Sequence, residues 1–479
     1  MKVCIIGTGF AGICMAIQLK QAGIEDFTIL EKANGLGGTW RENTYPGAEC
    51  DIPSALYSFS FELYPYWEYK WSHQPQILQY LKHCSQKYGL EKHIQYGKEL
   101  SSAHFQEDIG KWKIRTKDNT SYLAKFLIMG IGQLHHPQVP VVKGQETFQG
   151  TSFHSAVWQH DVSLENKNIA VIGNAASAIQ FIPEIADTAK SLFVFQRSAN
   201  WMLPKMDRAY HDLEKKIVSF FPDILKYYRF SQWLRTEFLY LILNGSVWLQ
   251  KLAESFAKSH MQGIIKDPGL RKKLTPEYPF GAKRVLFSDN YYQSLVKENV
   301  HLVMQEIQEI GQSSIVTTDG RAREIDILIY ATGFKTNPFF YNLTILGRGN
   351  RSIHEVWKEG AEAYLGITTN GFPNLFMLYG PNTNLGHSSI IFMIECQVNY
   401  IIQAVQEMEK TDSKFMDVND EVQKSYNAEI QAKLSRSVWN KVDTSWYKQG
   451  GKITNNWPGN TLDYEKITKK FDISKYELI

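Results

Sequence analysis

The chain has 479 residues, of which 43% are hydrophobic, 13% aromatic and 21% charged, and its formal net charge is +3. This length is enough for about three domains of ordinary size, and the composition excludes a disordered, collagenous or coiled-coil chain. The near-neutral charge provides no basic surface of the kind that binds nucleic acid, so we expect no nucleic-acid partner.

The cysteines and the apolar segments bear on the location of the protein. No Cys-x-x-Cys pair occurs among the five scattered cysteines Cys4, Cys14, Cys50, Cys84 and Cys396. We therefore expect free thiols in a reducing compartment rather than disulfides, a zinc site or a redox dithiol. The N-terminus fits no signal peptide, and the longest apolar stretch, 238–249, is too short and too interrupted to span a bilayer. We expect a cytoplasmic protein with no transmembrane segment and no metal.

The first thirty residues predict a strand, a glycine-rich turn, a helix and a second strand. A buried strand over 3–6 runs into Gly7, Gly9 and Gly12, residues 13–21 predict the helix, and a second strand over 27–30 ends at Glu31. The acid follows the third glycine by about 20 residues, which is the spacing of a dinucleotide-binding unit. The glycines allow a tight turn and a close approach of the pyrophosphate to the helix N-terminus. We expect Glu31 to accept hydrogen bonds from ribose hydroxyls.

A second unit of the same design begins in mid-chain. The strand over 169–172, the turn that starts at Gly173 and contains Ser177, the helix over 179–186 and the strand over 192–196 repeat the order of the first unit. This strand ends at Arg197, and a cation there suits the 2′-phosphate of NADPH. Ala175 occupies the place of the second glycine, and its methyl group would hold a pyrophosphate slightly away from the backbone. A domain of this type that no longer binds a nucleotide is the alternative.

Together the two units predict an α/β fold with two Rossmann-like dinucleotide-binding domains and a helical insertion in the second. We expect FAD in the first domain, because a flavin must stay bound, and NADPH in the second. The predicted ranges are 1–138 and 330–479 for the FAD-binding domain, 145–202 and 281–329 for the NADPH-binding domain, and 203–280 for the helical insertion. We expect the many aromatic residues of the insertion to serve helix packing; a substrate channel or a weak contact with a membrane surface is the alternative.

Several loop residues are candidates for the site. Consecutive glycines after Glu31 suit the passage of backbone past a large cofactor, and the candidates for contact with the flavin are Gly38, Thr39, Trp40, Asp51 and Tyr57. Taken alone, Asp51 lies in a Pro- and Gly-punctuated loop, where a carboxylate usually caps a turn or faces solvent. The adjacent cations Lys283 and Arg284 usually face solvent as well, but would also serve an anionic cofactor or intermediate.

The segment that links the two units carries a further motif, formed by Phe148, Gly150, His154 and Trp158. With this spacing the chain resembles the class B flavoprotein monooxygenases of the flavin-containing monooxygenase superfamily, and most of all the type I Baeyer–Villiger monooxygenases. Gln159 departs from the Pro or Asp that ends their linker fingerprint. The resemblance covers nearly the whole chain, through the two nucleotide motifs and the segments 45–47, 283–284, 331–334, 380–383, 445–447 and 456–459.

The resemblance implies a reaction and a set of roles. NADPH reduces FAD, a C4a-peroxyflavin forms with O2, and a ketone is converted to an ester or lactone. Arg284 then stabilises the peroxide anion and the adduct oxyanion, and Asp51 orients Arg284. Trp446 lines the substrate pocket and reaches NADP+, while the 2′-phosphate is bound by Arg197, Ser198 and Lys283. The alternatives are a flavin-containing monooxygenase that oxygenates nitrogen or sulfur in small molecules, and a flavin-binding module without turnover, which only Ala175 favours.

Overall fold

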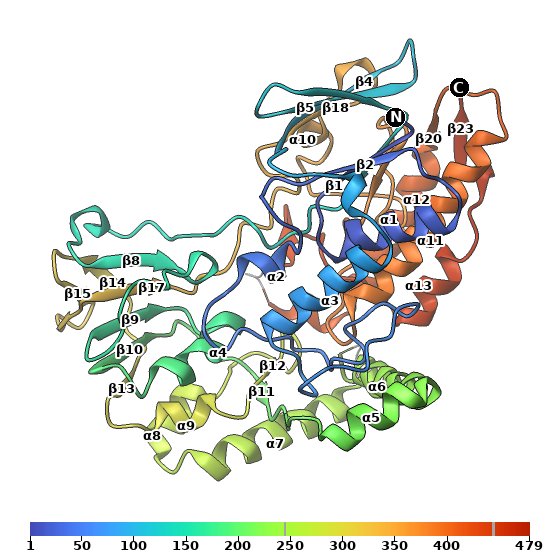
Figure 1. Cartoon of the computed structure of the whole chain (residues 1–479). Helices are drawn as coiled ribbons and strands as arrows, with labels where there is room; N and C mark the ends of the chain where they lie inside the picture. The colour runs from blue at the N-terminus through green and yellow to red at the C-terminus, as the bar shows by residue number, and fades with distance from the viewer. Residues whose placement is uncertain (244–245, 443–445) are drawn as a thin grey trace.

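The computed structural model describes residues 1–243, 246–442 and 446–479. Within these ranges the chain forms two lobes, each built on a five-stranded parallel sheet (Figure 1). The first sheet has the order β19-β7-β1-β2-β3 and the second the order β8-β17-β9-β10-β13, so the two sheets repeat one topology. The predicted α/β class with two Rossmann-like units is confirmed.

The first sheet is buried on both faces. Along β1, Val3 and Ile5 pack against one set of helices, while Cys4 and Ile6 pack against a second, mostly antiparallel sheet, as the two-residue period of a strand requires. The strands are β1 (Val3–Ile6), β2 (Phe27–Leu30), β3 (Ile94–Gln95), β7 (Phe126–Met129) and β19 (Leu375–Met377). The helices on one face are α1 (Phe10–Gln21), α3 (Gln74–Lys87) and α11 (Ile390–Glu409), and the sheet on the other is β4 (Leu100–Gln106), β5 (Lys111–Thr116), β6 (Ser121–Ala124) and β18 (Thr344–Leu346).

The second lobe has the same layers. Ile169 and Val171 of its central strand face two helices, and Ala170 faces a small antiparallel sheet. The strands are β8 (Thr151–His154), β9 (Asn168–Ile172), β10 (Ser191–Phe195), β13 (Val300–Val303) and β17 (Ile327–Tyr330); the helices are α4 (Ala176–Ile185) and α9 (Tyr291–Leu295); and the small sheet is β14 (Ile307–Ile310), β15 (Ser314–Thr317) and β16 (Ala322–Glu324). Both α1 and α4 begin three residues earlier than the sequence predicts, because each helix starts directly after its turn.

The segment between β10 and β13 carries the helices of the insertion, which lie along the lower edge of the molecule in Figure 1 and reach the first lobe. They are α5 (Asp212–Phe220), α6 (Pro222–Leu243), α7 (Val247–Ile264) and α8 (Pro268–Leu274), flanked by the paired strands β11 (Met202–Leu203) and β12 (Leu286–Phe287). Towards the C-terminus, α12 (Asp420–Leu434) and α13 (Thr461–Thr468) complete the first lobe. All five cysteines are free, and four of them are buried. Among the described residues, no helix combines the length and apolarity needed to cross a membrane.

Candidate active site

The first glycine-rich turn leaves bare backbone at the start of α1. Gly7 has a φ of +98°, and a Cβ on Gly12 would overlap the Gly7 carbonyl oxygen. A Cβ on Gly38 would lie 3.1 Å from the Cα of Gly9, so these two glycines bring two backbone segments together. Gly9 caps α1 without a side-chain hydrogen bond. The first amides of the helix are therefore presented beside a surface with no side chains, which suits a pyrophosphate.

The acid at the end of β2 is buried and already bonded within the protein. Glu31 accepts hydrogen bonds from the Thr8 amide at 2.9 Å and hydroxyl at 2.6 Å, from the Ala33 amide at 3.0 Å and from the Arg41 guanidinium at 3.1 Å. These bonds fix the carboxylate at the carboxyl edge of the first sheet. The turn, the strand end and the loop after it are thus tied together through one side chain.

The loop residues that follow pack against α1. Thr39 and Trp40 begin the short helix α2 (Thr39–Glu42), and the Trp40 indole donates a hydrogen bond to the Tyr57 hydroxyl at 3.1 Å. The Tyr57 ring lies 5.1 Å from that of Phe10 in an edge-on arrangement. Burial raises the pKa of Tyr57 well above its ordinary value, so this hydroxyl stays protonated.

The second turn has the same shape but a different cap. Gly173 has a φ of +110°, and a Cβ there would overlap the Ala331 carbonyl oxygen. Ala175 caps α4 with extended backbone (φ −87°, ψ −162°) and no side-chain hydrogen bond, a conformation that does not require glycine. Ser177 lies in the first turn of α4, beside the Tyr45 hydroxyl. The departure at Ala175 therefore leaves the backbone of the turn intact.

Two cations gather at the end of β10. Lys283 donates a hydrogen bond to the Ser198 hydroxyl at 3.4 Å, and its ammonium lies 4.7 Å from the centroid of the Tyr278 ring. Burial and the neighbouring Arg197 lower the pKa of Lys283. Arg197 is exposed, and its positive charge repels that of Lys283. A dianionic phosphate would relieve the repulsion between them.

The two lobes meet through Asp51 and Arg284. Asp51 Oδ2 accepts hydrogen bonds from Arg284 Nε at 2.8 Å and from Arg284 Nη2 at 2.5 Å, across 233 positions of sequence. The Asp51 and Arg284 side chains are 27% and 35% exposed, so solvent reaches the pair. Asp51 raises the pKa of the Arg284 guanidinium, which therefore carries its charge at every working pH. Loops of separate lobes thus hold one oriented cation.

Two tyrosines, Tyr379 and Tyr447, lie near Arg284, and Trp446 lies against Tyr447. Burial raises the pKa of Tyr447 to about 12 and raises that of Tyr379, while the nearby Arg284 opposes both shifts. The Trp446 ring lies 4.6 Å from that of Tyr447, and the Trp446 carbonyl accepts a hydrogen bond from Asn337 at 3.3 Å. Ser445, which belongs to the same segment of the predicted motif, lies outside the described residues.

The segment after β19 brings buried amides together. Asn382 donates to the carbonyls of Ile453 at 2.7 Å and Asn456 at 3.1 Å, and Asn384 donates to the Asn456 side chain at 2.9 Å. Among the described atoms, Asn382 Oδ1, Asn455 Oδ1 and Asn456 Nδ2 are buried without a hydrogen-bond partner. Such unsatisfied groups are costly in a folded protein, and a polar ligand beside them would remove the cost.

The linker motif packs against the second sheet. The Phe148 ring covers Gly150, where a Cβ would lie 2.5 Å from Phe148 Cζ. Trp158 lies 5.2 Å, centroid to centroid, from Phe181 of α4. His154 ends β8, its Nδ1 accepts a hydrogen bond from the Ala156 amide at 3.1 Å, and burial lowers its pKa. Packing against the second sheet therefore explains the residue types of the motif, and none of these contacts involves Asp51 or Arg284.

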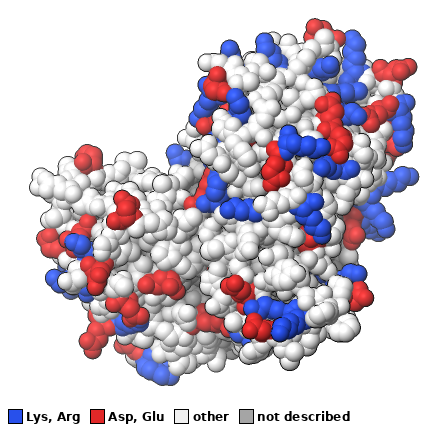
Figure 2. Space-filling model, in the orientation of Figure 1, with Lys and Arg blue, Asp and Glu red and all other residues white. Residues whose placement is uncertain are grey.

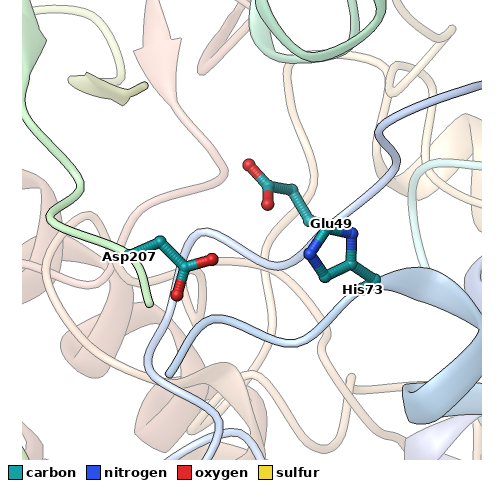
Figure 3. A group of neighbouring side chains, drawn as sticks. All are labelled: Glu49, His73 and Asp207. Atoms are coloured by element: carbon teal, nitrogen blue, oxygen red, sulfur yellow. The ribbon is translucent and has the colours of Figure 1, made fainter. Parts of the chain in front are cut away.

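A polar joint between the lobes was not predicted from the sequence. Three side chains lie close together here, those of Glu49, His73 and Asp207 (Figure 3). One carboxylate oxygen or imidazole nitrogen of each, an atom of the kind that binds metals, lies within 4.8 Å of the other two. The buried Lys205 ammonium pairs with Glu49, and Asp207 accepts a hydrogen bond from the Trp71 amide at 3.1 Å. Lys205 thus supplies the positive charge that a metal ion would supply at such a group. Tyr379 and Lys205 carry no local pattern from which the sequence could predict them, whereas Tyr447 belongs to the segment 445–447 of the resemblance, which gave it no role.

Comparison with known proteins agrees with this geometry. The model of the family described as flavin-binding monooxygenase-like matches residues 1–360. A Baeyer–Villiger monooxygenase of Pseudomonas aeruginosa is 42% identical, covering all of this chain and 91% of that protein. Among solved structures, closed cyclohexanone monooxygenase is similar at a TM-score of 0.89 and 26% identity, and OTEMO in complex with FAD and NADP at 0.89 and 26%; each covers 100% of this chain and 99% of the other. The chain therefore belongs to the flavin-binding monooxygenase-like family, among its Baeyer–Villiger monooxygenases.

Proposed function

We propose that this protein is an FAD- and NADPH-dependent monooxygenase that uses O2 to convert a small ketone to an ester or lactone. The overall reaction is ketone + O2 + NADPH + H+ giving ester + NADP+ + H2O. The observation that carries the proposal is the Asp51–Arg284 pair, because it places a permanently charged guanidinium between two nucleotide-type lobes. The five free thiols support a reducing, cytoplasmic location.

The first lobe fits FAD by its own chemistry. The bare backbone of Gly7, Gly9 and Gly38 would receive the pyrophosphate at the N-terminus of α1. The unsatisfied buried amides Asn382 and Asn455 would pair with a polar ring system. We assign Glu31, Gly38, Thr39, Trp40 and Tyr57 to the wall of this site. The 2′-hydroxyl of a ribose suits the edge at Glu31 better than a 2′-phosphate would, because the carboxylate would repel the phosphate.

The second lobe fits NADPH. Arg197, Ser198 and Lys283 offer two cations and a hydroxyl to a phosphate. Gly173 and Ser177 start α4 and would face the pyrophosphate. Arg197 and Lys283 place positive charge at the strand end of the second lobe, whereas Glu31 places negative charge at that of the first lobe. This contrast supports the binding of two different dinucleotides.

When bound, the flavin supplies the redox chemistry of hydride acceptance and oxygen activation. Arg284 has the role of a fixed positive charge aimed at oxygen that becomes negative when a nucleophile adds to the ketone carbonyl. Asp51 keeps the guanidinium in place through Nε and Nη2, and so acts as a positioning residue. Tyr379 and Tyr447 remain neutral because burial raises their pKa values. They therefore add no negative charge that would compete for Arg284.

Oxygenation of a nitrogen or sulfur atom is the competing function within the same family. A soft nucleophile of this kind develops positive rather than negative charge as it takes up oxygen, so a guanidinium would not assist it. The oriented Arg284 therefore favours the ketone as substrate. Sulfur oxidation as a side activity should then depend little on Arg284.

The test compares Arg284→Ala with Arg321→Ala, a matched control at an exposed arginine beside Asp319. The Arg284→Ala variant should keep its FAD and still oxidise NADPH, while ester formation from a cyclic ketone falls by roughly 100-fold or more. The control should match the unaltered enzyme in all three measurements. Full ester formation by Arg284→Ala would overturn the assignment.

A further inference from the structure

The helices α5, α6 and α7 of the insertion expose an unusual number of large apolar side chains. Of the exposed large apolar residues in the described chain, half lie between 213 and 256. We call this set the apolar face; its members are Leu213, Ile217, Phe220, Phe221, Ile224, Tyr227, Phe230, Leu234, Phe238, Leu241, Val247, Trp248, Leu252 and Phe256. Phe220 is 77% exposed and Trp248 67%. Summed over the three helices, these side chains expose an area on the order of 1,000 Å².

The spacing of these residues shows that they form stripes. On α6 they recur every three or four residues from Ile224 to Leu241, over about 25 Å of helix. On α7, Trp248, Leu252 and Phe256 follow one another at intervals of four. Because α6 packs against both α5 and α7, the stripes belong to one helical layer, which forms the lower edge of the molecule in Figure 1.

The side of α6 that faces the protein is mixed: its buried residues are Leu225, Gln232, Thr236 and Leu243, and several polar groups on this side are bonded to the first lobe. The Arg229 guanidinium donates to the carbonyls of Ala55 at 2.7 Å and Ser58 at 2.9 Å. Further along, the Thr236 hydroxyl bonds that of Ser388 at 2.9 Å. A surface helix ordinarily turns its apolar face inward, whereas α6 also carries a row of large apolar side chains on its outer side. The sequence predicts ordinary helix packing for the aromatic residues of the insertion, but many of them point outward in the structure.

The same helix is held further along by a buried carboxylate. Glu237 accepts a hydrogen bond from the Thr461 hydroxyl at 2.8 Å, and its carboxylate lies 3.4 Å from His387 Nε2. The side chains of Glu237 and His387 are largely buried. Together with Arg229 and Thr236, this contact holds α6 against the first lobe, so hydrogen bonds help to set the orientation of the helix.

The charges around the apolar face are mostly positive. On α5, α6 and α7 the exposed cations are Lys216, Lys226, Arg235 and Lys251, and the exposed acids are Asp212 and Asp223. Asp212 is paired with Lys215 at 3.2 Å and Asp223 with Lys226 at 3.0 Å. Figure 2 shows white atoms around one group of charged side chains in this part of the molecule. The layer thus combines aromatic and aliphatic side chains with an excess of cations.

We propose that the apolar face lies in the interfacial layer of an anionic lipid membrane. Amphipathic helices with Phe, Trp and Leu on one face and Lys or Arg around it bind this layer by apolar burial and by attraction to anionic headgroups. A second copy of the chain fits less well, because a two-fold contact would bring the cations of one copy against the same cations of the other. The proposal is independent of the catalytic assignment, since lipid binding requires no turnover.

Co-sedimentation of the purified holoenzyme with vesicles tests this proposal. The protein should partition at least ~10-fold more strongly onto phosphatidylcholine vesicles that contain phosphatidylglycerol than onto phosphatidylcholine alone, and raised salt should reduce the difference. A triple variant, Phe238→Ala with Trp248→Ala and Phe256→Ala, should lose at least ~10-fold of its partitioning while it keeps its FAD and its rate of NADPH oxidation.

A charge-reversal variant and a control variant separate the contribution of the cations to lipid binding from that of the apolar side chains. Lys216→Glu with Arg235→Glu and Lys251→Glu should abolish the preference for phosphatidylglycerol. The control replaces exposed aliphatic residues outside the apolar face, Ile109→Ala with Val141→Ala and Val296→Ala, and should bind vesicles as the unaltered enzyme does. Failure of the holoenzyme to sediment with any vesicle would overturn the proposal. So would equal binding to both lipid compositions, or a dimer in light scattering that the triple alanine variant dissolves.

Discussion

Replacing Asp51 by asparagine should slow ketone oxidation and leave both cofactors bound. The substitution keeps the shape of the side chain and one acceptor oxygen, but removes the charge that attracts Arg284 Nε and Nη2. Because the two side chains are 27% and 35% exposed, solvent screens the pair, and we expect a loss of about 1–2 kcal/mol in orientation of the guanidinium. This corresponds to a fall of about 5- to 30-fold in kcat/KM for the ketone.

The assay follows ester formation and NADPH oxidation together for Asp51→Asn, Arg284→Ala and the double variant. If Asp51 acts only by positioning Arg284, the double variant should be no slower than Arg284→Ala alone. The amount of ester formed per NADPH should fall in each variant, while the FAD content stays constant. Losses that multiply in the double variant, or an Asp51→Asn enzyme with undiminished kcat/KM, would refute this reasoning.

Four further outcomes follow from other parts of the structure. Arg197→Ala should raise KM for NADPH about 10-fold and leave kcat and the KM for NADH nearly unchanged, because only the 2′-phosphate contact is lost. An equal rise in KM for NADPH and NADH in steady-state assays would contradict this prediction. Ala175→Gly should lower KM for NADPH a few-fold, since the extended backbone there accepts either residue, and an unchanged KM would show that the methyl group is not in the way. Lys205→Met should cost about 2–4 kcal/mol of unfolding free energy in urea titrations, because Glu49 is left buried and unpaired. Adding Glu49→Gln to this variant should recover most of the lost stability. A loss that the second substitution does not reduce would show that Lys205 stabilises the protein by packing instead. Burial lowers the pKa of His154, so the unfolded chain binds more protons than the folded chain as the pH falls below about 6.5, and the folded state loses up to ~1.4 kcal/mol of stability per pH unit. The variant His154→Asn keeps an acceptor for the Ala156 amide but does not titrate, so its stability relative to the unaltered protein should rise as the pH falls from 7.5 to 5. A difference in stability that stays constant with pH would argue against this role of His154.

Much of the fold could be predicted because its signals are local. The strands over 3–6 and 27–30 appear with the bounds that their apolar runs predict. Gly7 and Gly173 mark turns that require positive φ, which few other residues adopt. The topology of both sheets follows from one repeated strand, turn and helix unit. Local pattern and global architecture agree in these segments.

The parts that could not be predicted depend on contacts between distant segments. Asp51 and Arg284 lie 233 positions apart, and taken alone each has the sequence context of an ordinary loop residue; only the resemblance to a family connected them. Lys205 carries no motif, and its burial against Glu49 follows from the docking of the two lobes. The outward orientation of the apolar side of α6 likewise depends on the polar contacts of Arg229 on its other side.

The most direct test of the account is oxygen incorporation from 18O2. The holoenzyme is given NADPH, a cyclic ketone and a thioether in one reaction, and the products are identified by mass spectrometry. We expect a lactone that contains one labelled oxygen atom and forms in proportion to NADPH consumed, with production that depends on Arg284, while the smaller amount of sulfoxide does not. Labelled sulfoxide without lactone would contradict the assignment to ketones, and consumption of NADPH that yields only hydrogen peroxide would contradict the proposed oxygenation itself.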